Sequence, residues 1–179
     1  RAAPSSLLFW ELVALVPAAI ILVGTATESA RRTVFTHVAI THLGGAGTWI
    51  AILLLAHEGA IGDSTALTEG SGIQAVIAIA AIIGFGTKAG LMPMHAWLPR
   101  AHPIAPAPIS ALMSGVMVAV AAYGLVRVLV DWIGTAPSWI GATVLILGGL
   151  SALGGITYAL FQSDLKRLQA ALDDVLPDV

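Results

Sequence analysis

The stretch KAGLMPMHAWLPRAHP occupies residues 88–103 and interrupts a long apolar segment that begins near Ile73. A proline inside a helix removes a hydrogen-bond donor and its ring clashes with the preceding turn, so Pro93 predicts a break in the helix. Irregular backbone at membrane depth is tolerated only where protein or a wet cavity satisfies its polar groups. Broken helices of this kind mark binding or conduction sites in transporters. The stretch therefore predicts a discontinuous membrane span with a functional site at its break.

The remainder of the chain is also strongly apolar. Of its 179 residues, 58% are hydrophobic and 10% are charged, with a mean hydropathy of +0.92, which excludes a water-soluble globule. A helix needs roughly 17 to 25 apolar residues to cross a hydrocarbon core of about 30 Å. Five segments meet this length: residues 7–23, 33–56, 73–92, 109–130 and 139–161. We expect an all-α fold, a polytopic transmembrane helix bundle of five spans with one broken helix over residues 1–168, and a short acidic tail at 169–179.

Basic residues lie in alternate connections between the expected spans. Arg31 and Arg32 follow the first span, Arg100 follows the third, and Lys166 and Arg167 follow the fifth. Cytoplasmic loops carry an excess of Lys and Arg. We therefore expect a multi-pass protein of the cell membrane (inner or plasma membrane), with its N-terminus outside and its C-terminus cytoplasmic.

Several kinds of partner are excluded by composition. The chain has no cysteine, so it forms no disulfide and no Cys-ligated zinc or iron–sulfur site. Its net charge is −2 and its basic residues form no run, which argues against nucleic acid as a partner. His37 and His42 are five residues apart and turn about 140° from each other on a helix, so they cannot share one metal. We expect no metal and no cofactor in this chain.

Four motifs together carry a family resemblance. They are FWEL at residues 9–12, KAGLMPMHAWLPRAH at 88–102, SALMSGVM at 110–117 and DLKRL at 164–168. In this order and spacing the chain resembles the antiporter-like, proton-translocating membrane subunits of NADH:quinone oxidoreductase, of formate hydrogenlyase-type (hydrogenase-4-type) membrane hydrogenases and of multisubunit Na+/H+ antiporters. Residues 101–117 are most similar to the hydrogenase branch. The resemblance implies a fragment of a subunit with about fourteen helices in two inverted repeats, of which these five match the fifth to the ninth.

The resemblance implies that Glu11 and Lys88 form the ion-paired start of a proton path. An ionisable group near the bilayer centre costs about 2.5 to 3.5 kcal/mol on insertion scales, which also favours a functional role. The alternative is a helix that ends at Gly90, with Lys88 extending from the last turn to the interface. Counted from Ser5 and Ile73 at 1.5 Å per residue, Glu11 and Lys88 lie about 13 Å out of level. Their pairing therefore needs a later start or a tilt of the third span.

The remaining histidines and Arg127 have weaker assignments. His37 and His95 are possible proton relays; otherwise His37 is a hydrogen-bonded packing residue and His95 caps carbonyls freed by the break. His57 and His102 are expected to face water or headgroups. Arg127, near the outer end of the fourth span, is expected to extend toward the interface.

The resemblance implies a proton-translocating subunit of a redox-driven complex that carries no redox centre itself. Its partners would be the lipid bilayer, other membrane and redox subunits, and protons or Na+. The alternatives are a Na+/H+ antiporter subunit and a truncated scaffold without transport. The chain departs from many relatives in the fourth span, where Ser114 or Ala119 replaces a lysine or histidine, and after Leu168, where the acidic tail replaces a tenth helix.

Overall fold

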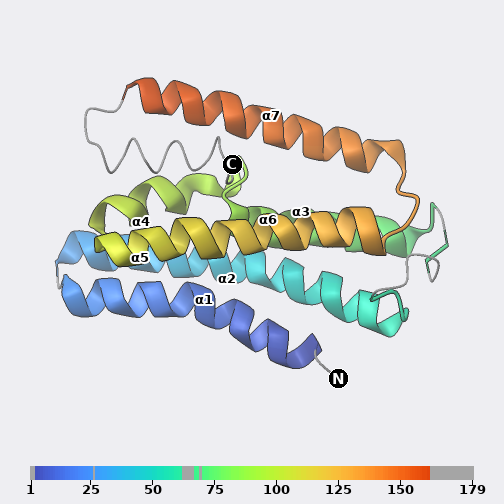
Figure 1. Cartoon of the computed structure of the whole chain (residues 1–179), viewed down its shortest axis with the longest axis horizontal. Helices are drawn as coiled ribbons and strands as arrows, with labels where there is room; N and C mark the ends of the chain where they lie inside the picture. Colours follow the sequence, from blue (N-terminus) through green and yellow to red (C-terminus); the bar gives the residue numbers. More distant parts are fainter. Residues whose placement is uncertain (1–2, 26, 62–66, 69, 162–179) are drawn as a thin grey trace.

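The computed structural model describes residues 3–25, 27–61, 67–68 and 70–161 (Figure 1). Asp63, Lys166, Arg167 and the predicted tail lie outside these residues. The elements are α1 (Ala3–Gly24), α2 (Glu28–His57), α3 (Gly72–Ala89), η1 (Met94–Trp97), α4 (Leu98–Ile104), α5 (Ala107–Leu112), η2 (Met113–Val118), α6 (Ala119–Val126), η3 (Arg127–Trp132) and α7 (Ser138–Leu160). The described residues contain helices and no strand, which confirms the all-α prediction.

Five helical segments are long and apolar enough to cross a membrane: Leu7–Gly24, Glu28–His57, Gly72–Ile104, Ala107–Trp132 and Ser138–Leu160. Successive segments run in alternating directions along the bundle (Figure 1). The five predicted spans are therefore confirmed. The second begins earlier than residue 33, because the Thr27 hydroxyl accepts the Ala30 N–H at 3.2 Å and Glu28 complements the helix dipole.

The third span breaks earlier than predicted. Helix α3 ends at Ala89, and Gly90 adopts the left-handed conformation at φ +79°. The Leu91 N–H donates to the Gly86 carbonyl at 2.8 Å, which completes a glycine-based helix stop. The prediction that Pro93 ends the helix was wrong by three residues, because Gly90 can take the left-handed conformation that terminates it first. Beyond Pro93 the chain continues as η1 and α4 toward the same end of the bundle (Figure 1).

The fourth span contains two π-helical segments that the sequence pattern did not predict. They are η2 (Met113–Val118) and η3 (Arg127–Trp132), which flank α6. The wide turn at the end of η3 is closed by the Ile133 N–H, which donates to the Val128 carbonyl at 3.0 Å. Ser114 lies within η2 and Ala119 begins α6. π-Helical turns inside α-helices are frequent at functional sites.

Helices α2 and α3 approach at backbone distance because both present glycine at the contact. A Cβ atom on Gly47 would lie 2.7 Å from the Ala80 carbonyl oxygen, and one on Gly84 would lie 2.8 Å from the carbonyl carbon of Gly47. Small residues allow helices in membranes to approach closely. The third span is consequently the most buried of the five, with 61% of its apolar window inside the structure.

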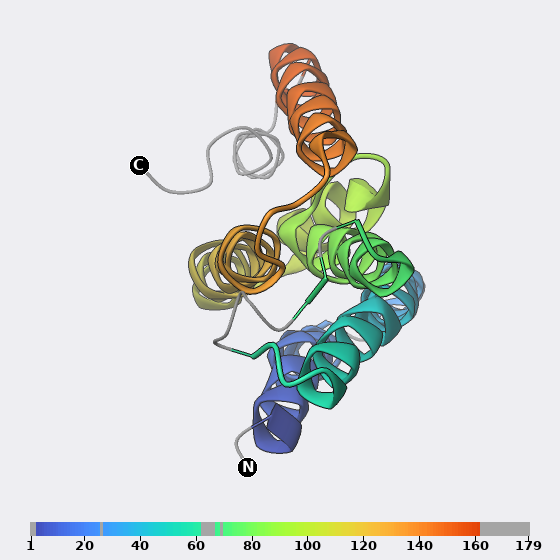
Figure 2. The ribbon, with the colours of Figure 1, turned by 90° about the vertical axis from the view of Figure 1, so that its right-hand side faces the viewer.

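Helix α7 lies apart from α1 and α2, and it is the least buried span at 17% (Figure 2). Its polar link to the rest of the chain is at the break, where the Met92 N–H donates to Ser151 Oγ at 2.7 Å. Ser151 in turn donates to the Leu147 carbonyl at 2.8 Å. A side chain on α7 thus satisfies one backbone donor of the irregular segment, as irregular backbone at membrane depth requires.

Candidate functional site

Lys88 is fully buried in the last turn of α3. Its side chain has 0% exposure, and Nζ donates to the Trp10 carbonyl oxygen at 2.6 Å. Nζ also lies 4.3 Å from the centroid of the Trp10 ring, which stabilises a cation through its π face. The helix does end at Gly90, as the interface alternative required. However, the amine points into the bundle toward α1, so Lys88 does not extend to the interface.

Glu11 supplies the opposite charge from α1. Its Oε1 lies 3.8 Å from Lys88 Nζ and accepts the indole N–H of Trp49 at 3.3 Å. Glu11 lies eight residues after the start of α1, about 12 Å, whereas Lys88 lies sixteen residues after the start of α3, about 24 Å. The described part of α1 begins deeper along the bundle than α3 (Figure 1), and this offset brings the two groups level. The offset depends on packing and could not be obtained by counting residues.

Two features of the surroundings fit the carboxylate closely. A Cβ atom on Gly45 would lie 2.7 Å from Glu11 Oε1, so α2 needs a glycine where the carboxylate packs. The Trp10 ring packs edge-on against Phe85, with centroids 5.1 Å apart. These aromatic rings exclude water beside the ion pair, and in such surroundings charges interact more strongly than in water.

A buried carboxylate–amine pair beside a broken membrane helix agrees with the family that the four motifs indicated. Residues 5–171 match the family described as NADH:quinone oxidoreductase/Mrp antiporter, TM. The chain belongs to this family. The resemblance carried by the four motifs is confirmed. The chain is therefore part of a multi-pass, proton-antiporter-like membrane subunit of the type found in NADH:quinone oxidoreductase and hydrogenase complexes.

Relatives with different functions match this antiporter-family chain. An uncharacterized protein of Mycobacterium tuberculosis, Rv0083, is 41% identical over 92% of this chain and 26% of its own length. Hydrogenase-4 component B of Escherichia coli is 43% identical over 73% of this chain and 20% of its own. A Na(+)/H(+) antiporter subunit of Alkalihalophilus pseudofirmus is 35% identical over 56% and 20%. The chain spans about a quarter or less of the length of these relatives.

His37 is a buried side chain of this antiporter-family bundle that lies close to the helix break. Its Nε2 is 3.1 Å from the Ala14 carbonyl oxygen, and its ring centroid is 4.8 Å from that of Trp97. Because a carbonyl only accepts, Nε2 carries a proton. The Trp97 N–H donates in turn to the Thr87 carbonyl at 2.9 Å, next to Lys88. These contacts make His37 a hydrogen-bonded packing residue adjoining the site, and its relay role stays a prediction.

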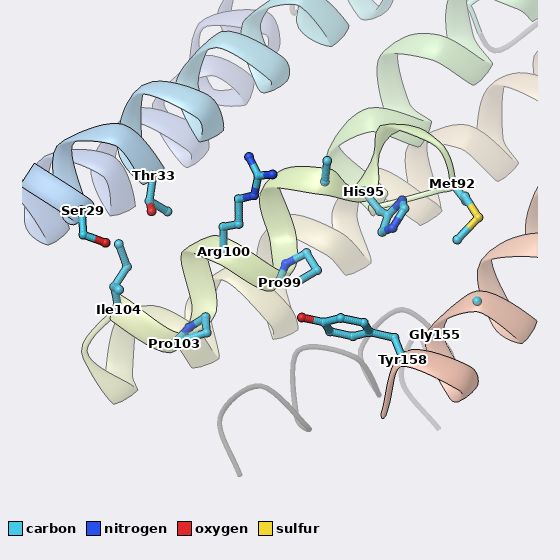
Figure 3. Close-up of a pocket in the computed structure, with 12 residues that line it drawn as sticks. Ser29, Thr33, Met92, His95, Pro99, Arg100, Pro103, Ile104, Gly155 and Tyr158 are labelled. Atoms are coloured by element: carbon cyan, nitrogen blue, oxygen red, sulfur yellow. The ribbon is translucent and has the colours of Figure 1, made fainter. Parts of the chain in front are cut away.

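His95 lies elsewhere, beside a cavity of about 530 Å³ between the break, the start of α2 and the end of α7 (Figure 3). The cavity is also lined by Ser29, Thr33, Arg100 and Tyr158. Glu11 and Lys88, by contrast, meet between α1 and α3 and do not line this cavity. The structure therefore separates His95 from the ion pair, and a relay role for it stays a prediction.

The expectation for His102 was wrong. His102 is buried at 1% exposure, and its Nδ1 lies 2.8 Å from Ser110 Oγ, on the helix after the break. Helix α4 folds back into the bundle and carries His102 inside, whereas the sequence pattern placed this residue in a connection. His57 is exposed at the end of α2, as predicted. Arg127 is half-exposed and pairs with Asp131 one turn further along.

Sequence reasoning missed His42 as part of the site. His42 Nε2 lies 3.5 Å from Glu11 Oε2, on the side of the carboxylate away from Lys88. The signal was present in the sequence, because His42 is an ionisable residue halfway along an apolar segment. It was considered only as a partner of His37 in a metal site. Among the described residues, no group of three His, Cys, Asp or Glu side chains is placed to hold a metal ion.

Proposed function

We propose that the chain is part of a proton-translocating membrane subunit in a redox-driven complex of the NADH:quinone oxidoreductase or membrane-bound hydrogenase type. The observation that carries the proposal is the Glu11–Lys88 ion pair, buried among apolar helices and next to a helix break. Ionisable residues inside membrane bundles are costly and mark proton relays and ion pathways. The redox energy would come from other subunits, since this chain has no cysteine to hold an iron–sulfur cluster.

In the proposed mechanism, Lys88 holds its proton while Glu11 is ionised. A conformational change that moves Glu11 away, or a proton that neutralises it, leaves the Lys88 ammonium without a counter-charge in surroundings poor in water. An unpaired buried charge is strongly unfavourable, so the proton passes to the next acceptor. The break after Gly90 is the proposed direction of release. Return of the Glu11 charge then favours the uptake of a new proton by Lys88.

A Na+/H+ antiporter subunit is the second candidate, and the similarity to the antiporter subunit of Alkalihalophilus pseudofirmus favours it. A buried carboxylate paired with an amine serves either function. The two functions differ in what drives transport. Proton movement that is driven by a sodium gradient in vesicles, without substrate for any redox partner, supports the antiporter function.

Substitution of Glu11 tests the role of the pair. We expect Glu11→Gln to lower redox-driven proton uptake by inverted membrane vesicles about 100-fold, at the lower end of the effect of a positioned proton-transfer group. Glutamine has a similar size but no charge to hold the Lys88 ammonium. The matched control is Glu28→Gln, which removes a charge from an exposed pair with Arg32. Normal proton uptake by Glu11→Gln in the assembled complex would exclude the proposed role.

The proposed orientation can be tested by labelling. With the N-terminus outside and the C-terminus cytoplasmic, single cysteines at Asp63 and Arg167 should react with a membrane-impermeant maleimide from opposite sides of sealed membranes. Both positions lie outside the described residues, and the chain has no cysteine of its own that could react. Labelling of both positions from the same side would contradict the five-span orientation.

A further inference from the structure

A second ionisable group contacts Glu11 from α2. His42 lies fourteen residues after the start of this thirty-residue helix, close to its middle. Its Nε2 is 3.5 Å from Glu11 Oε2, whereas Lys88 approaches Oε1. The carboxylate is thus placed between an imidazole and an amine, with one oxygen turned toward each.

The hydrogen bonds around His42 determine which atoms carry protons. His42 Nδ1 lies 2.9 Å from the Val38 carbonyl oxygen. A carbonyl oxygen only accepts, so Nδ1 is the donor. In the neutral ring, Nε2 then holds a lone pair that faces the carboxylate. A lone pair and an ionised carboxylate oxygen repel each other, so this contact becomes favourable only when a proton lies between His42 and Glu11.

The carboxylate oxygen on this side lacks a donor. Glu11 Oε2 is buried, and within the described ranges it accepts no hydrogen bond. Buried polar atoms are nearly always hydrogen-bonded, and an exception calls for an explanation. A proton arriving on His42 Nε2 would supply the missing donor.

The three side chains become progressively more buried from His42 inward. His42 is 38% exposed, Glu11 is 19% exposed and Lys88 is 0% exposed. The imidazole is therefore the member of the group that a proton from outside this bundle reaches first.

On the proposed function of the Glu11–Lys88 pair, we infer that His42 is the proton-entry residue of this site. A proton that binds at His42 Nε2 forms an imidazolium that pairs with Glu11 Oε2. Glu11 is then shared between two cations, and its hold on the Lys88 ammonium weakens, so Lys88 releases its proton toward the break. One proton enters at the imidazole and one leaves at the amine, so the charge of the site is restored once the His42 proton has moved on through Glu11 to Lys88.

Two substitutions and an added base test this inference in membranes that carry the assembled complex. His42→Gln keeps a polar side chain of similar length but cannot carry a proton at neutral pH. We expect it to lower proton uptake about 100-fold, as expected for a lost proton-transfer group, with normal assembly. His42→Ala should show the same loss, and added imidazole should restore much of the uptake, because a small base can enter the vacated, partly exposed position. The matched control is His57→Gln, at the exposed end of the same helix.

The outcomes separate the inference from the function on which it rests. Normal proton uptake by His42→Gln, together with loss of uptake by Glu11→Gln, would overturn the role of His42 and leave the ion pair in place. Loss in His42→Ala that imidazole does not restore would mean that His42 only packs, which also overturns the inference. Normal uptake by both His42→Gln and Glu11→Gln would overturn the proposed function itself. Rescue of His42→Ala by imidazole is the result that supports proton entry at this residue.

Discussion

Lys88→Ala is expected to abolish coupled proton transfer, with a loss of at least about 100-fold. Alanine is the best helix former and removes a buried amine that is costly in the membrane. Glu11 keeps its hydrogen bond from Trp49 and its contact with His42, so α1 and α2 retain their polar partners. The complex should therefore assemble. The measurement is redox-driven proton uptake by inverted vesicles, with the amount of complex determined by native gel electrophoresis.

Lys88→Arg distinguishes a proton carrier from a structural cation. A guanidinium keeps the positive charge but does not release its proton at any accessible pH. If Lys88 only balances Glu11, arginine should support proton uptake. If Lys88 carries the proton, arginine should fail as alanine does. Full uptake by Lys88→Arg would therefore refute the carrier role and leave Lys88 as a fixed counter-charge.

The sequence predicted those parts of the fold that depend on local pattern. Five apolar segments of spanning length predicted the five spans, because the hydrocarbon thickness sets the length of each. Proline and glycine near residue 90 predicted the break. The error at the break also has a local reason: Gly90 ends α3 before Pro93 can do so.

The sequence could not predict the parts of the site that depend on how helices are offset. Counted depths left Glu11 and Lys88 out of level, and their pairing was available only through the family resemblance. The structure brings them level because the described part of α1 begins deeper than α3 (Figure 1). His42 was missed for the same reason, since its contact with Glu11 depends on the level of α2 against α1. His102 was misplaced because α4 folds back into the bundle after the break.

The level of these helices is set largely by the glycine contact between α2 and α3. A Cβ atom on Gly84 would lie closer than van der Waals distance to the backbone of Gly47 and Thr48. Backbone atoms cannot rotate away as a flexible side chain can, so any larger residue must push the helices apart. Gly45 and Gly47 lie on the same stretch of α2 as His42 and Trp49, so such a shift would displace both contacts of Glu11 on that helix.

We therefore expect Gly84→Val to reduce the amount of assembled complex and to lower proton uptake per complex that remains. Overpacking a tight contact costs about 1 to 3 kcal/mol, and a loss of about 1 to 2 kcal/mol changes the cellular abundance of a protein several-fold. Gly149→Val is the matched control, because no described atom lies within 4 Å of a Cβ at that position on α7. The amount of complex is measured by native gel electrophoresis, and proton uptake is then expressed per complex. If Gly84→Val assembled and pumped as well as Gly149→Val, the glycine contact would not be what holds Glu11, His42 and Lys88 at one level.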